Sequence, residues 1–241
     1  MNLNVNYSHL IMLTVLGLLG GIAIFPYSTA LKPEMTLTTK MITLSVVQSL
    51  ITMIFVVWIG LKAASVLGLR IYSPPGRIWI AVTAGLFAGF LILVLDKFVF
   101  APHLPEAFTG ISENISLWKR FLACFYGGIT EELLMRWFLL SGIFWLLSRF
   151  WTNGDGTAAA GAFWVANIIA ALLFGLGHLP ATAALAKLSP LLISRALILN
   201  GAGGIIFGVI FWKYGLFAAM VSHFSADIVL HVISSLVQTK Q

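Results

Sequence analysis

Two acids and a base lie close together in a stretch that otherwise has the composition of a membrane-spanning helix. They are Glu131, Glu132 and Arg136, within the segment EELLMR. An ionisable residue at the centre of a membrane helix costs roughly 2.5–3.5 kcal/mol on insertion scales. The three residues must therefore face a protein interior or a watery cavity and find partners there. Intramembrane ionisable residues are candidates for a functional site, and this cluster is such a candidate.

The spacing within this cluster predicts different roles for the two acids. Residues four apart share a helix face, so Glu132 and Arg136 are expected to form a structural ion pair. A rotation of about 100° per residue places Glu131 about 140° away from Arg136. Glu131 is therefore expected to be a carboxylate that is free to act as a general base.

Two later segments carry possible partners. FGLGH ends in His178, and HFSAD places His223 and Asp227 four residues apart, with His231 one turn further on. A lone histidine in an apolar helix is usually a satisfied core group. An acid, a histidine and a His-x3-Asp pair on three separate apolar segments favour a functional site instead. Asp227 could orient either His223 or His231, and the sequence leaves this open.

The composition determines which kind of fold must position these residues. The chain has 241 residues, of which 60% are hydrophobic and only 9% are charged. Soluble domains have about 25% charged residues. We therefore expect an all-α integral membrane protein with about seven transmembrane helices and its active site within the helix bundle. Seven apolar segments are long enough to span a bilayer, at roughly 20 residues each: Leu10–Tyr27, Met41–Leu61, Ile78–Phe100, Phe121–Phe150, Thr157–Leu179, Leu191–Trp212 and Leu216–Val237.

The connecting segments and the charge give further expectations. The most polar stretch, His103–Arg120, is expected to lie at the membrane interface, and Thr152–Thr157 is expected to be a tight turn between helices. The formal charge of +6 comes from lysines and arginines that lie mostly between apolar segments. Such residues orient membrane helices, so membrane lipid is the expected partner and nucleic acid is not.

The three motifs together resemble a known family. EELLMR, FGLGH and HFSAD match the EExxxR, FxxxH and HxxxN/D signatures of the CAAX prenyl protease type 2 and bacteriocin-processing (CPBP, or Abi) intramembrane proteases, in the same order. The resemblance covers Leu117–Leu236, about half of the chain. It implies a division into three accessory transmembrane helices at residues 1–103 and a catalytic core at residues 117–236.

The resemblance also implies a role for each matching residue. Glu131 and His178 would hold and deprotonate the attacking water, while His223 and Asp227 would stabilise the oxyanion. Many family members have asparagine where this chain has Asp227, and an aspartate can donate a hydrogen bond only when protonated. No cofactor is expected. The alternative is a zinc site, because Glu131, His178, His223 and Asp227 are all acceptable zinc ligands.

The expected function is that of an intramembrane endopeptidase acting on a peptide or a membrane-anchored protein. Cleavage could be of the CAAX type or could process a peptide precursor. The alternatives are a non-catalytic bacteriocin-immunity or scaffold protein, a zinc-dependent intramembrane metalloprotease and a small proton-coupled transporter. The short loops and the absence of a soluble domain suggest a prokaryotic plasma membrane.

Overall fold

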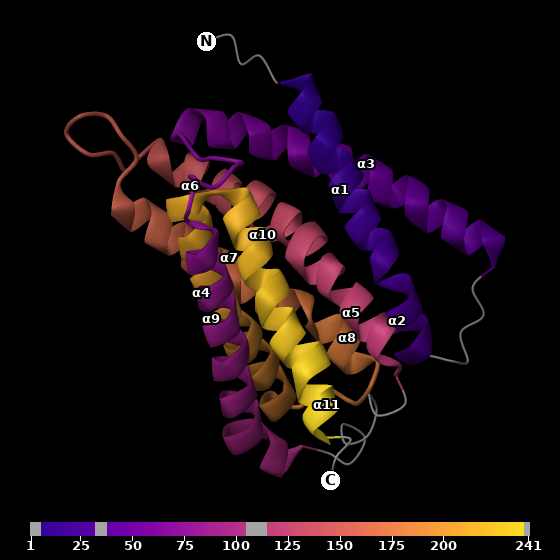
Figure 1. Ribbon diagram of the computed structural model, residues 1–241. Coiled ribbons are helices and arrows are strands. Elements are labelled where there is room, and N and C mark those ends of the chain that lie inside the picture. The colour runs from indigo at the N-terminus through magenta and orange to yellow at the C-terminus, as the bar shows by residue number, and fades with distance from the viewer. Residues whose placement is uncertain (1–5, 32–37, 105–114, 239–241) are drawn as a thin grey trace.

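The computed structural model describes residues 6–31, 38–104 and 115–238. Figure 1 shows long helices packed side by side, with the C-terminal helices in the middle of the bundle. Within the described ranges, the pairing of backbone strands is limited to one isolated β-bridge between Thr152 and Ala158. The prediction of an all-α integral membrane protein is confirmed.

Within the part of the chain that the structure describes, six helices are long and apolar enough to cross a membrane. They are Tyr7–Leu31, Thr39–Leu67, Ile78–His103, Ala160–Ala183, Pro190–Tyr214 and Leu216–Val237. The continuous helical run Leu117–Ser148, which carries the acid–base cluster, is the seventh long helix. The elements in chain order are α1 (Tyr7–Ala23), α2 (Phe25–Leu31), α3 (Thr39–Leu67), α4 (Ile78–Leu95), η1 (Asp96–Phe100), η2 (Ala101–His103), α5 (Leu117–Phe125), η4 (Tyr126–Glu131), η5 (Leu133–Leu140), α6 (Ser141–Ser148), α7 (Ala160–Gly177), α8 (Leu179–Ala183), α9 (Pro190–Tyr214), α10 (Leu216–Asp227), η6 (Ile228–Ile233) and α11 (Ser234–Gln238).

The long helices begin and end at residues suited to those positions. The Thr38 hydroxyl accepts a hydrogen bond from the backbone N–H of Met41 at the start of α3, and Gly68 ends that helix in the left-handed conformation. Ser189 caps α9 in the same way, followed by Pro190 at the first helical position. These signals set the helix lengths and therefore the depth of each functional side chain.

The turn between α6 and α7 is held by polar contacts. The N–H of Asn153 donates to the carbonyl of Thr157, and the Thr157 N–H and hydroxyl both donate to Asp155. These bonds lower the pKa of the Asp155 carboxyl. The prediction of a tight turn at Thr152–Thr157 is confirmed. Most of the expected interfacial segment, residues 105–114, lies outside the described residues.

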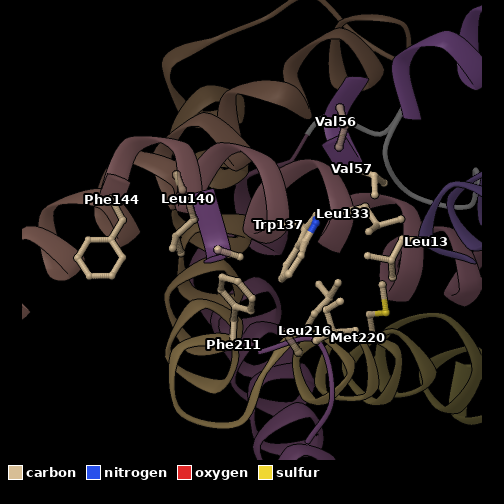
Figure 2. Packing of buried hydrophobic residues seen from close by; sticks show 14 of the residues in the cluster. Leu13, Val56, Val57, Leu133, Trp137, Leu140, Phe144, Phe211, Leu216 and Met220 are labelled. Carbon is tan, nitrogen blue, oxygen red and sulfur yellow. The ribbon is translucent and has the colours of Figure 1, made fainter. Parts of the chain in front are cut away.

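Small residues let the helices around the site approach closely. A Cβ on Gly85 of α4 would collide with the carbonyl of Ser222 in α10, and one on Gly89 would lie 2.8 Å from the carbonyl of Ala226. Close approach at small residues is typical of packing between membrane helices. The main apolar cluster includes Leu133, Trp137 and Phe211, as Figure 2 shows.

Two stretches of the motif-bearing helix have π-helical hydrogen bonding, η4 and η5. The expectation from sequence assumed α-helical spacing throughout this segment. π-helical turns change which residues share a face, and they occur frequently at functional sites. Here Glu131 ends η4, and Glu132 joins it to η5.

Candidate active site

The ion pair expected from the sequence is present and fully enclosed. Nη1 of Arg136 lies 2.9 Å from Oε1 of Glu132, and the two side chains are 3% and 0% exposed. Nη2 of Arg136 donates to the carbonyl of Gly204 at 3.1 Å. The guanidinium also lies over the rings of Phe174 and Phe207. Arg136 therefore joins the motif-bearing helix to α7 and α9.

Glu132 has a second partner that sequence reasoning missed. Nδ1 of His223 lies 2.8 Å from Oε1 of Glu132, the same oxygen that pairs with Arg136. An ionised carboxylate can only accept, so Nδ1 carries the proton. Glu132 thus fixes both the orientation and the tautomer of His223. A carboxylate can accept several hydrogen bonds, so the sequence did indicate that Glu132 could have a partner besides Arg136. It did not indicate which residue that partner is.

The other ring nitrogen of His223 faces the remaining two acids. Nε2 lies 3.8 Å from Oε2 of Glu131 and 3.7 Å from Oδ1 of Asp227. The same Asp227 oxygen lies 4.0 Å from Nε2 of His231. Asp227 thus stands between the two histidines at similar distances, without a direct hydrogen bond to either. The orienting partner of His223 is Glu132.

Packing explains how these groups reach one another. A Cβ on Gly127 would collide with Oδ2 of Asp227 and would lie 3.1 Å from Nε2 of His223. Gly127 is therefore needed for the close approach of η4 to α10. On the opposite side, the ring of Phe207 stacks on the His223 imidazole, with centroids 4.5 Å apart and planes at 21°. The imidazole is held between a glycine backbone and an aromatic face.

His178 lies at the end of α7, beside this group. Its Nδ1 is 2.8 Å from the carbonyl of Phe174, which accepts, so Nδ1 carries the proton and Nε2 is left for other contacts. The ring of Phe174 makes edge contacts with both His178 and His223, at 4.8 and 5.8 Å between centroids. The structure therefore brings Glu131, His223 and Asp227 together directly and places His178 next to them across Phe174.

The residues proposed as alternative zinc ligands are Glu131, His178, His223 and Asp227. Among the described residues, no group of three or more His, Cys, Asp or Glu side chains is arranged to hold a metal ion. Of the four residues, Glu131 and Asp227 each have an oxygen near Nε2 of His223, at 3.8 and 3.7 Å.

Residues 113–229 match the family model described as type II CAAX prenyl endopeptidase, Rce1-like. This part of the chain, just under half of it, is similar to the Rce1-like family. The match runs from just before α5 into η6, so the Rce1-like region includes all six motif residues discussed above. The resemblance to the CPBP proteases is thereby confirmed, and with it the general class of intramembrane CAAX-type protease. No curated protein and no solved structure matches the chain.

Proposed function

We propose that the protein is an intramembrane endopeptidase in which Glu131 activates the attacking water without a metal ion. The observation that carries this proposal is the convergence of Glu131 and Asp227 on Nε2 of His223, at 3.8 and 3.7 Å. Polar atoms at such separations are suited to being bridged by a water molecule. The group is enclosed in the bundle, where electrostatic interactions are stronger than in water.

The exposure of the two glutamates supports giving them different roles. The Glu131 side chain is 16% exposed, while that of Glu132 is completely buried. Glu131 is therefore the carboxylate that water and substrate can reach. It takes a proton from water as the oxygen attacks the carbonyl carbon, and it later returns that proton to the leaving amine nitrogen.

His223 is the proposed donor to the oxyanion. Its Nδ1–H is held by Glu132, so in the imidazolium form its Nε2–H points into the gap beside Glu131. A donor that is already aimed at the developing charge needs no reorganisation during the reaction. Asp227 lies on the other side of the same nitrogen and acts through the imidazole. For His178, the role of a second water-holding group stays a prediction.

The proposed substrate is a peptide or a membrane-anchored protein cleaved near the membrane surface, by CAAX-type cleavage or precursor processing, in a prokaryotic plasma membrane. A non-catalytic immunity or scaffold role would not need Glu131. The enclosed and oriented His223 favours catalysis, because a scaffold has no use for a fixed tautomer.

The direct test is Glu131→Gln in proteoliposomes, with cleavage of prenylated and unprenylated CAAX peptides followed by mass spectrometry. Comparing membrane peptides from cells that carry the wild type or Glu131→Gln extends the test to unknown substrates. The amide keeps the shape but cannot accept the water proton, so we expect activity to fall by about 10²–10⁴-fold with an unchanged melting temperature. Asp155→Asn, the same change in an exposed turn, is the matched control. Full activity of Glu131→Gln would refute the glutamate mechanism.

A chelation experiment separates the two mechanisms. We expect activity to survive dialysis against phenanthroline and EDTA, because in the proposed mechanism Glu131 activates the water without a metal ion. A zinc hydrolase loses its activated water when the ion leaves. Elemental analysis of the purified protein provides the independent measurement. Stoichiometric zinc that is lost and restored together with activity would establish the metalloprotease alternative.

A further inference from the structure

A cavity of about 310 Å³ opens between α1, α3 and the loop that follows α3. Its polar lining includes one cation, Lys62, and neutral side chains that can donate hydrogen bonds: Asn6, His9, Ser65, Tyr72 and the indole of Trp137. Among the described residues, the lining contains neither aspartate nor glutamate. The cavity is separate from the acid-rich site around Glu131, and its polar character favours an anion.

The position of this cavity relative to the membrane surface can be inferred from pairs of a basic side chain and a tryptophan at the same end of the bundle. At this end the turn between α9 and α10 contacts the loop that follows α3. The backbone N–H groups of Leu216 and Phe217 donate to the carbonyls of Arg70 and Ile71. Tryptophan and long basic side chains gather where a membrane meets water. Three such pairs lie near this end: Lys62 over Trp58, Arg149 over Trp145 and Lys213 over Trp212.

Lys62 belongs to this interfacial belt and also lines the cavity, with its ammonium 3.8 Å from the centroid of Trp58. The cavity therefore opens at the level of lipid headgroups. Among the described residues, the fixed charges at this end are mostly positive: Lys62, Arg70, Arg77, Arg149 and Lys213, against Asp155.

Trp137 supplies an unused donor in the lining. The residue is only 1% exposed, and its Nε1–H has no hydrogen-bond partner among the described residues. The indole edge lies against Gly60, where a Cβ would be 2.7 Å from Nε1, one turn before Ala64 in the cavity wall. A buried donor without a partner is unusual and points to a ligand or ordered solvent.

We propose that this cavity binds a phosphate-bearing anion at the membrane surface, with Lys62 providing charge and Trp137, His9 and Tyr72 providing hydrogen bonds. Either a phospholipid headgroup or free phosphate has this chemistry. The inference does not depend on the proposed protease function. The cavity borders η5, because Trp137 of η5 lines it.

The test uses delipidated protein in detergent and three probes: phosphatidylglycerol, diacylglycerol with the same acyl chains, and inorganic phosphate. Native mass spectrometry reports the bound species, and the shift in melting temperature reports affinity. We expect one saturable phosphatidylglycerol per chain and no matching diacylglycerol adduct. If inorganic phosphate competes with the lipid, the cavity recognises the phosphate alone; if it does not, the ligand is the phospholipid.

Variants locate the binding. Lys62→Gln is expected to lower the affinity about tenfold, because a charge-assisted hydrogen bond is lost. Trp137→Phe keeps an aromatic ring, removes the N–H donor and should give a smaller loss. Lys213→Gln is the matched control: its ammonium also lies over a tryptophan at this end, but it does not line the cavity. Equal binding of diacylglycerol, or an equal loss in Lys62→Gln and Lys213→Gln, would overturn the proposal.

Discussion

Two acid–arginine pairs in the bundle make similar contacts in very different surroundings. Glu132 and Arg136 lie four residues apart on one helix, with side chains that are at most 3% exposed. Asp96 and Arg195 lie 99 residues apart and form a two-bond contact at 2.6–2.7 Å, with both side chains about a quarter exposed. The first pair is enclosed by the site, and the second links η1 to the start of α9.

The difference in burial indicates what each pair does. A buried ion pair is weak evidence for added stability, because removing both charges from water costs several kcal/mol or more per ion. The buried pair in this protein has a further use, since Glu132 also holds Nδ1 of His223. The Asp96–Arg195 contact involves no residue of the proposed active site. We infer that the cost of burying the Glu132 carboxylate is tolerated because this carboxylate orients His223. The Asp96–Arg195 pair serves to connect two helices.

The largest expected effect comes from breaking the buried pair. Glu132→Ala leaves Arg136 without its partner in a low-dielectric interior, and Arg136→Ala does the same to Glu132. Each should lower the free energy of unfolding by about 3–5 kcal/mol, the usual result for one half of a buried pair. Equilibrium unfolding in mixed micelles measures this. Lys97→Gln, which removes an exposed charge elsewhere, is the control, and a similar small change in all three variants would show that the pair is not buried.

The buried pair also illustrates what the sequence could predict. The i,i+4 spacing predicted the Glu132–Arg136 contact, and that contact is confirmed at 2.9 Å. The long apolar segments predicted the helices, because length and hydropathy are local properties. The contacts of Glu132 with His223 and of Asp96 with Arg195 join residues 91 and 99 positions apart. Such contacts depend on how helices pack, and no local spacing encodes that.

The second prediction replaces both charges of the buried pair. The double variant Glu132→Met/Arg136→Met removes both charges and keeps the side-chain volume. Buried pairs replaced by apolar residues are often neutral in stability. The double variant should therefore be more stable than either alanine variant. Part of the gain is offset, because the Gly204 carbonyl and the His223 Nδ1–H each lose a hydrogen-bond partner, which costs about 1–3 kcal/mol of stability per group.

Activity gives a separate measurement on the same double variant. Proteolysis should stay lost after stability recovers, because His223 no longer has Glu132 to fix its ring. A double variant that regains both stability and wild-type cleavage would show that Glu132 does not orient His223. One as unstable as the sum of the two single changes would show that the charges are not coupled.

The smallest expected effect belongs to the partly exposed pair. Asp96→Asn keeps the shape of the side chain and removes its charge, and Arg195→Gln removes the charge with a shorter polar side chain. The contact between η1 and α9 therefore weakens without leaving a deeply buried ion. Pairs of this kind contribute up to about 1 kcal/mol, and screening by salt reduces the contribution. Each variant should therefore lose about 1 kcal/mol or less in low salt, with a smaller difference from wild type at high salt. The same unfolding measurement at two ionic strengths tests this. Lys97→Gln, at the position next to Asp96, is the charge-removal control.

One outcome would contradict this prediction: a loss of stability as large as that of Glu132→Ala and unchanged by salt. Asp96 and Arg195 would then be as desolvated as the pair at the site, and the contrast between the two pairs would not hold.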